Sequence, residues 1–468
     1  MAVTAIEHTY QYRFSSGYQA DSSDSGKGRL ALATDVSVNI PGKTKAKKSA
    51  SKTSGDSQFF DGVLLRPKQA GSLLRAVSEI VNARFNNPNW QRFSDPVITC
   101  GDDRIRFEGF SSCCSAYVRA DFLPGAVDGK RPVRGTTNVD FNPAMLASLG
   151  SLRDRDYVQM TIGPEVFELK KNAENQVEKK VSLPMRWLKG LVEIQVCQAR
   201  MAPMLEISGV EARRFLRSIP RTKTRVPVYI VPSGRGLRLS QIAGRGGVKA
   251  AGLERLRVLE SLVPDAEMLR IYGDDESGNS SWELVLPEAR FHLMLSPDVW
   301  RGFSGEGQVL DSLAKNDYES YLKPIETALT WESVIDVGAL SRKTGATPVT
   351  VRAALAALGT RGLVGYDLET ASYFHRVLPF DLSLVEKLQP RLVNARKLLA
   401  DGKVRISQQT AERIEAFVAG TDVEHFVRIT DDGAKCTCPW YAKHQGERGP
   451  CKHVLAVQLL LEESITER

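Results

Sequence analysis

Hydrophobic positions follow two alternating periods along the first 300 residues, and these periods predict short strands interrupted by short helices. The stretch "PVITCGDDRIRFEGF" at 96–110 alternates with period two around a Gly-Asp-Asp step, which predicts a hairpin of half-buried strands. The stretch "RPKQAGSLLRAVSEIV" at 66–81 repeats its apolar residues three and four apart, which predicts an amphipathic helix. The pattern therefore gives a strand, a helix and then a hairpin.

The same order of elements recurs, with strands beginning near residues 60, 136, 202 and 268. The repeat is one of element order and not of matching residues. We therefore expect an α+β multidomain protein in which 1–300 form a repeated strand-helix-hairpin region. This region resembles the half-domains of DNA sliding clamps, a resemblance that implies helices lining a basic inner surface. The alternative is an unrelated α+β domain with several antiparallel sheets.

Two further segments depart from this pattern. Residues 41–57, "PGKTKAKKSASKTSGDS", contain no large apolar side chain and are predicted to form a mobile loop. Residues 381–419 are predicted to be a helical linker.

Residues 318–380 are mostly helical in pattern and predict a winged helix-turn-helix. A short helix ends at a turn at Gly345, and a second begins at the expected N-cap Thr347 with Pro348 in its first turn. The stretch "LVGYDLETASYFHRV" then reads as a two-stranded wing. The exposed face of the second helix, with Arg352 among alanines, offers few groups that read base edges, so DNA contact competes with protein docking or internal packing. The candidate phosphate contacts here are Arg342, Lys343, Arg352 and Arg361.

Three of the seven cysteines lie near the end of the chain, in "CTCPWYAKHQGERGPCKH" at 436–453. The spacing is Cys436-x-Cys438, twelve residues, then Cys451-x-His453. Two close pairs of thiolate and imidazole ligands suit one structural, tetrahedral Zn²⁺ with no open position. A strand hairpin is expected to carry the first pair, and an amphipathic helix to begin at the second. His444 lies inside the spacer and is an alternative ligand to His453, although its polar loop favours a solvated side chain.

These residues resemble the SWIM zinc-finger family, whose signature is CxC, a variable spacer and CxH, with a proline after the second cysteine and a basic residue between the last ligands. Pro439 and Lys452 stand at those positions. The resemblance covers about 420–463, implies a ββα finger, and carries the metal-ligand role to Cys436, Cys438, Cys451 and His453. SWIM modules are associated with binding DNA or proteins. The order of segments, with "SPDVWRGFSGEG" before the helical region, further resembles bacterial SWIM proteins encoded beside MoxR-type ATPases and von Willebrand A proteins.

Composition and the N-terminal sequence argue against a membrane-spanning or exported protein. The 468 residues are 42% hydrophobic and 25% charged, and no apolar run approaches the roughly 20 residues that span a membrane. No export or transit signal is visible at the N-terminus, so we expect a cytoplasmic protein.

The net charge of +8 is concentrated in one segment. Residues 212–253 contain ten Lys or Arg and no Asp or Glu, which predicts either a polyanion-binding surface or a solvated basic one. The candidate nucleic-acid contacts are Arg213, Arg214, Arg217, Arg221, Lys223, Arg225, Arg235 and Arg238.

Catalytic signatures are absent from the sequence, which has no Walker loop, GxSxG or HExxH motif. We therefore expect a non-enzymatic zinc protein that binds DNA through nonspecific phosphate contacts. The first alternative is a protein adaptor that works with a MoxR-type AAA+ ATPase. A weaker one is a nuclease or hydrolase whose carboxylates, such as Asp102 and Asp103, assemble only in the fold.

Overall fold

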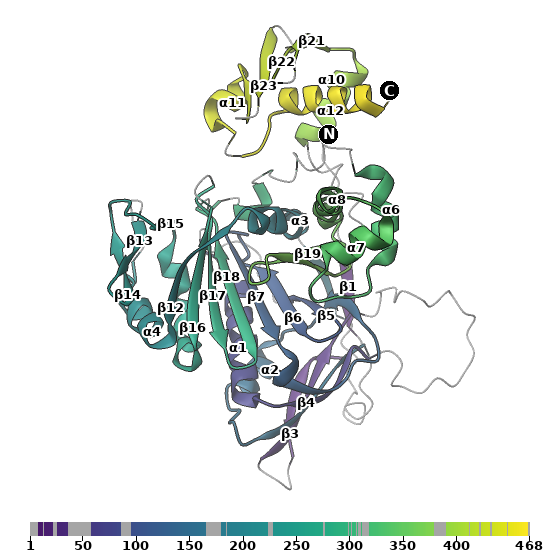
Figure 1. Ribbon diagram of the computed structural model, residues 1–468. Coiled ribbons are helices and arrows are strands. Elements are labelled where there is room, and N and C mark those ends of the chain that lie inside the picture. Colours follow the sequence, from purple (N-terminus) through teal and green to yellow (C-terminus); the bar gives the residue numbers. More distant parts are fainter. Residues whose placement is uncertain are drawn as a thin grey trace, which may run out of the picture.

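A computed structural model gives the arrangement of the elements (Figure 1). The structure describes residues 8–12, 14–21, 26–35, 58–85, 95–164, 179–183, 185–222, 228–274, 277–297, 299–300, 302–305, 307, 310, 318–378, 390–410, 412–420, 423–430, 433–446 and 448–466. The predicted loop 41–57 lies outside these residues. None of the helices in the described part of the chain combines the length and apolar character that a membrane span requires.

An antiparallel eight-stranded sheet is the centre of the N-terminal region, and two parts of the chain contribute four strands each. The strand order is β12-β16-β17-β18-β7-β6-β5-β9. The earlier part supplies β5 (Val97–Cys100), β6 (Ile105–Phe110), β7 (Ala116–Phe122) and β9 (Gly135–Asn138). The later part supplies β12 (Ala202–Ser208), β16 (Met268–Gly273), β17 (Ser280–Leu286) and β18 (Ala289–Leu295).

The two faces of this sheet differ in chemistry because successive side chains of a strand point to opposite faces. One face is apolar, with Phe107, Val118 and Phe291 in the main core, and α1 (Pro67–Asn82) packs against β6 and β7. The other face carries Arg106, Arg119 and His292, which are also buried. The segment 318–378 contacts Arg106 and Arg119 on this second face.

A second sheet of five strands has the order β2-β3-β10-β4-β8. Only its β3–β10 pair is parallel. The strands are β2 (Gly17–Ala20), β3 (Lys27–Ala33), β4 (Phe60–Leu64), β8 (Val127–Lys130) and β10 (Tyr157–Gly163). Beside it lie α2 (Pro143–Leu149) and the antiparallel pair of β1 (His8–Tyr12) and β11 (Lys179–Leu183).

A small lobe, which we name the basic lobe, stands at the β12 edge of the large sheet (Figure 1). It contains α4 (Gly209–Ser218), the hairpin β13 (Val228–Ser233) and β14 (Gly236–Ser240), and β15 (Val248–Ala250). The helix α4 begins at the N-cap Ser208 and packs Phe215 against Trp282 of the large sheet. The 3-10 helices η3 (Leu253–Ser261) and η4 (Val263–Asp265) lead back to β16.

Residues 318–378 form three helices and a hairpin around their own apolar cluster. They are α6 (Glu319–Ala328), α7 (Val337–Thr344), α8 (Pro348–Thr360), β19 (Val364–Asp367) and β20 (Ser372–His375). The expected turn and cap are present, because Gly345 has a φ of 74° and the Thr347 side chain accepts from the amide of Thr350. The end of α8 packs on α3 (Met185–Ala199), where Gly359 meets Gln195. Part of α8 therefore serves internal packing.

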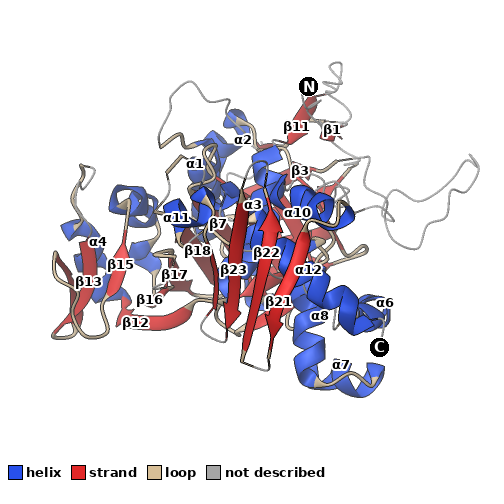
Figure 2. Ribbon diagram, turned by 90° about the horizontal axis from the view of Figure 1, so that it is seen from above, coloured by secondary structure: helices blue, strands red, loops and turns tan. Residues whose placement is uncertain are grey.

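We name the part of the chain from α10 (Pro390–Ala400) to α12 (Lys452–Thr466) the C-terminal module (Figure 2). Its buried apolar residues form a separate cluster. A four-stranded antiparallel sheet packs on α12 (Lys452–Thr466), and α12 packs on α10 (Pro390–Ala400). The strands are β21 (Val404–Gln409), β22 (Arg413–Ala419), β23 (Glu424–Thr430) and β24 (Gly433–Cys436), and α11 (Pro439–His444) follows them.

Three sequence predictions about the fold were wrong. The elements of one repeat do not form one unit, since β4 joins the five-stranded sheet whereas β5 to β7 join the large one. The repeat that begins near residue 136 implied a hairpin of β10 and β11, but β11 pairs with β1, and the helix α3 that follows was missed. The predicted helical linker 381–419 contains α10 but also β21 and β22, which extend the sheet of the expected ββα finger.

Candidate metal centre and basic surfaces

The four predicted ligands come from two places in the C-terminal module. Cys436 ends β24, where it pairs in register with Val427, and Cys438 is the N-cap of α11. Cys451 and His453 stand at the start of α12, whose Val454 and Val457 are buried in the cluster behind them. A strand end and a helix start therefore deliver one ligand pair each.

The ligand atoms converge on one point. The three sulfur atoms and an imidazole nitrogen lie within 4.8 Å of one another, and all four residues are buried. The Cys436 Sγ lies 3.8 Å from Nδ1 of His453. Backbone amides of Tyr441 and Val454 donate to the sulfur atoms of Cys438 and Cys451 at 3.4 and 3.5 Å. These amides fix the sulfur positions and stabilise negative charge on them.

Protonation of the cluster is shared between its sulfur atoms. A hydrogen bond from the Cys436 thiol lowers the pKa of Cys451 to about 4, whereas the pKa of Cys436 is raised because its thiol donates that bond. A thiolate is the form that binds metal. Three thiols and one imidazole at these separations fit the ligand set of a closed structural Zn²⁺ site.

The alternative ligand His444 is placed elsewhere. Its ring packs against Trp440 at the end of α11, with a centroid distance of 4.3 Å and the two rings tilted by 50°, and it is not part of the ligand cluster. Trp440 also carries the guanidinium of Arg391 over its ring, 4.6 Å from the centroid. His453 therefore takes the ligand position that the CxH spacing predicted.

The predicted basic residues lie in two separate groups. Arg213, Arg214, Arg217, Arg221, Arg235 and Arg238 are exposed in the basic lobe, as are Arg245 and Lys249, whereas Lys223 and Arg225 lie outside the described residues. Arg214 donates to Glu211 at 2.5 Å, one residue before the acid-free window of the sequence. Arg342, Lys343, Arg352 and Arg361 are exposed around α7 and α8, on the opposite flank of the large sheet in both views (Figures 1 and 2). The structure does not bring the two groups together.

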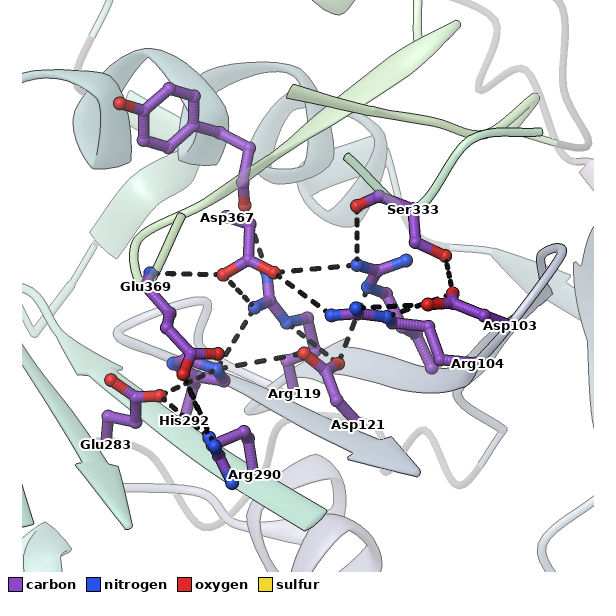
Figure 3. A network of polar contacts seen from close by, with 12 residues as sticks. Asp103, Arg104, Arg119, Asp121, Glu283, Arg290, His292, Ser333, Asp367 and Glu369 are labelled. Atoms are coloured by element: carbon purple, nitrogen blue, oxygen red, sulfur yellow. Dashed lines mark hydrogen bonds and ion pairs between the residues drawn. The ribbon is translucent and has the colours of Figure 1, made fainter. Parts of the chain in front are cut away.

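A buried charged network, which sequence reasoning missed, joins the large sheet to the β19–β20 hairpin (Figure 3). Asp367 of the hairpin accepts from Arg119 at 3.1 Å and pairs with Arg106 at 3.5 Å. Arg119 also pairs with Asp121 at 3.0 Å and lies 3.0 Å from Nε2 of His292. Glu369 continues the network through Arg270 and Arg290 to Glu283.

Electrostatic effects in this network follow from its burial. Burial and the charge of Arg119 hold the pKa of His292 well below its ordinary value, so the ring is neutral. Burial raises the pKa of Glu283 to about 7. The arginines of the network face carboxylates from both sides of the interface, so loss of one carboxylate would leave buried positive charge uncompensated.

The two carboxylates considered for a hydrolytic site are engaged by basic residues. Asp102 pairs with Arg134, and Asp103 pairs with Arg104 and accepts from the hydroxyl of Ser333. Each of these carboxylates therefore forms an ion pair with a neighbouring arginine.

Comparisons with known proteins give one family match, and it lies in the C-terminal module. Residues 425–460 match the SWIM zinc finger family. No curated protein matches the chain. Among solved structures, the crystal structure of proliferating cellular nuclear antigen from Entamoeba histolytica has 9% identity and a TM-score of 0.31, over 52% of this chain and 99% of that one. A similarity this low supports no conclusion, and the expected likeness to sliding clamps stays a prediction. The segment 425–460 is thus similar to SWIM zinc fingers, and Cys436, Cys438, Cys451 and His453 fit one structural Zn²⁺.

Proposed function

We propose that the protein is a non-enzymatic, zinc-stabilised nucleic-acid-binding protein whose main contact surface is the basic lobe. The observation that carries this proposal is the set of exposed cations on α4 and the β13–β14 hairpin. Within the described residues, no ion pair joins Arg213 or Arg217 to a carboxylate. Uncompensated guanidinium groups on one small lobe are suited to phosphates, because each contact releases counterions from the nucleic acid.

The other elements have supporting roles in this proposal. Zinc holds the C-terminal module folded, because metal-binding free energy in small zinc modules is largely folding free energy. Residues 318–378 act as a winged helix-turn-helix, with Arg342, Lys343 and Arg352 as further phosphate contacts. The end of α8 is packed on α3, so this second surface contributes fewer contacts than the basic lobe.

The salt dependence of binding tests the proposal. Changing Arg213 and Arg217 together to Gln removes two cations four residues apart on one side of α4. If both contact duplex DNA, the slope of log affinity against log salt should flatten by about 1–2, since each contact contributes about −0.9.

A charge-matched control separates this lobe from general basicity. Arg153→Gln with Arg155→Gln changes the same net charge at exposed residues before β10, and should leave the slope unchanged. Equal slopes for wild type and the Arg213/Arg217 variant would exclude the basic lobe as the DNA surface.

A second candidate function is an adaptor that binds protein partners, including an ATPase of the MoxR type. Two exposed apolar side chains favour it, because Val210 at 63% and Ile242 at 78% exposure lie among the arginines of the basic lobe. A mixed apolar and basic surface suits an acidic protein. This function predicts no measurable DNA affinity near physiological salt, while the Arg213/Arg217 variant loses capture of the partner.

A further inference from the structure

A two-residue turn at the tip of the β13–β14 hairpin carries Arg235. The last strand pair before the turn is Ser233 with Gly236, so Gly234 and Arg235 alone connect the two strands. Gly234 has a φ of 61°, the left-handed conformation that two-residue hairpin turns require at their first position. A Cβ added to Gly234 would meet no atom within 4 Å, so the turn lies in open space. Arg235 is therefore presented on a narrow support, with glycine on either side.

A second turn of the basic lobe, at 244–247, presents Arg245 in the same way. It is closed by the amide of Gly247, which donates to the carbonyl oxygen of Gly244 at 2.9 Å. Gly246 has a φ of 70°, and a Cβ added there would also meet no atom within 4 Å. Arg245 therefore stands between glycines at the corner of a turn that faces open space.

The strand register places both turns at one end of the small sheet. The strands β13 and β15 are antiparallel and pair Ile230 with Val248, so the residues before Val248 run towards the same end as those after Ile230. The second turn lies beside Val231, whose Cγ1 would be 3.0 and 2.9 Å from Cβ atoms added to Gly244 and Gly247. The first turn begins three residues beyond Val231, a distance of about 10 Å along a strand. The turns are therefore offset by roughly the rise of three base pairs of DNA.

The charge around these turns is positive. Arg235 and Arg245 are exposed, and no carboxylate pairs with either within the described part of the chain. Residues 228–250 contain no Asp or Glu. Glu211 of α4 lies near the start of β14, but Arg214 donates to its carboxylate at 2.5 Å. The two turns therefore offer uncompensated guanidinium groups to a polyanion.

We propose that Arg235 and Arg245 enter the minor groove of duplex DNA, so that the basic lobe selects A·T-rich sequence. The inference rests on the proposed function, because it requires that the basic lobe contacts DNA. A minor groove about 6 Å wide admits a single side chain but not a helix, and the flanking glycines let the backbone of each turn approach the groove. Runs of A·T pairs narrow the groove and strengthen its negative potential, which attracts arginine, whereas guanine places its N2 amino group there. Arg213 and Arg217 of α4 then contact phosphates outside the groove.

The test compares three duplexes of equal length by fluorescence anisotropy, with the full-length, zinc-loaded protein. Their centres are a run of A·T pairs, a run of G·C pairs, and the same G·C run with inosine in place of guanine. An inosine·C pair lacks the amino group in the minor groove but keeps the N7 and O6 acceptors of guanine in the major groove. The A·T and inosine·C duplexes should both bind about tenfold more tightly than the G·C duplex, near the lower end of what one wrong base pair costs.

Two charge-matched variants assign the preference to the turns. Arg235→Gln with Arg245→Gln should remove the preference among the three duplexes. Arg238→Gln with Lys249→Gln removes the same charge from exposed positions within β14 and β15, and should weaken binding to all three duplexes alike while the preference stays. Thermal melting checks that both variants stay folded.

The outcomes separate this inference from the proposed function. Equal binding of the wild type to the three duplexes overturns the minor-groove inference and leaves DNA binding by the basic lobe intact. An inosine·C duplex that binds like the G·C duplex places the contact in the major groove and overturns the inference as well. A preference that survives the Arg235/Arg245 variant shows that other residues read the groove, which also refutes it. Absence of binding to every duplex overturns both the inference and the proposed function.

Discussion

Replacing Asp367 by Asn should release the β19–β20 hairpin from the large sheet. The carboxylate is buried and faces Arg119 at 3.1 Å and Arg106 at 3.5 Å. The variant keeps the shape of the side chain but leaves these two guanidinium groups with Asp121 as the one remaining carboxylate between them. Removing one partner of a buried ion pair costs about 3–5 kcal/mol, because the remaining charge stays buried without compensation.

Hydrogen exchange of the hairpin amides measures this cost locally, which avoids treating a chain with several cores as two-state. The amides of 364–367 and 372–375 should exchange at least about 100-fold faster in the variant, since about 1.4 kcal/mol is one factor of ten. The control is Asp401→Asn, whose partner Lys403 is 3.4 Å away with both side chains 37–45% exposed. Such an exposed pair contributes about 0–1 kcal/mol.

The pH dependence of hairpin stability is a second measure of the Asp367 ion pairs. Burial raises the pKa of Asp367, but Arg119 and Arg106 outweigh burial and lower it below its ordinary value. The stabilisation is therefore present above the unfolded pKa of about 3.9 and is lost as pH falls through the folded value. Hairpin exchange within a factor of three of wild type for Asp367→Asn would refute the view that this network holds the hairpin.

Three further predictions concern other parts of the molecule. Cys438→Ser should lower the zinc content below one ion per chain and make residues 404–463 sensitive to protease while the large sheet stays intact, and full metal in that variant by elemental analysis would contradict the ligand assignment. Glu283→Gln should flatten the stability profile between roughly pH 4 and 7, because a pKa raised to about 7 gives stability that is present below about 4.3 and lost as pH rises through 7. An unchanged pH dependence of stability in denaturant titrations would oppose this. Gly209→Ala should destabilise the basic lobe by about 1–3 kcal/mol, since its Cβ would lie 1.7 Å from the Ala266 carbonyl oxygen, whereas Gly17→Ala, with no atom within 4 Å, should be neutral in thermal melting.

The sequence predicted helices and strands correctly where one face of the element is apolar and packs on the core, because the spacing of the apolar residues then shows the type of element. The helix α1 and the hairpin β5–β6 follow the periods of their apolar residues, and the cap at Thr347 follows local chemistry. The zinc ligands were readable because two CxC-like pairs bring their donors together through short local structure.

The sequence did not predict which distant strands pair with each other, and it did not predict the charged network. Alternation in "RIRFEGF" correctly marks Arg106 and Glu108 as sharing one face, but a polar face is ordinarily predicted to meet water. Here the hairpin more than 200 residues later covers it, with Arg376 bonded to Glu108 and Asp367 to Arg106. The missed signal was that the covering segment itself carries charges, in "YDLET".

The seam between β7 and β18 limits how this chain can be divided. Seven residue pairs, from Ala289–Phe122 to Leu295–Ala116, join the strands of the earlier half of the large sheet to those of the later half. A fragment that stops near residue 200 would leave β7 without its neighbour, and a fragment that begins there would leave β18 bare. Both would present long unpaired edges of the kind that seed aggregation. Expression of either half alone should thus give insoluble protein, while the two halves produced together could reassociate along this edge.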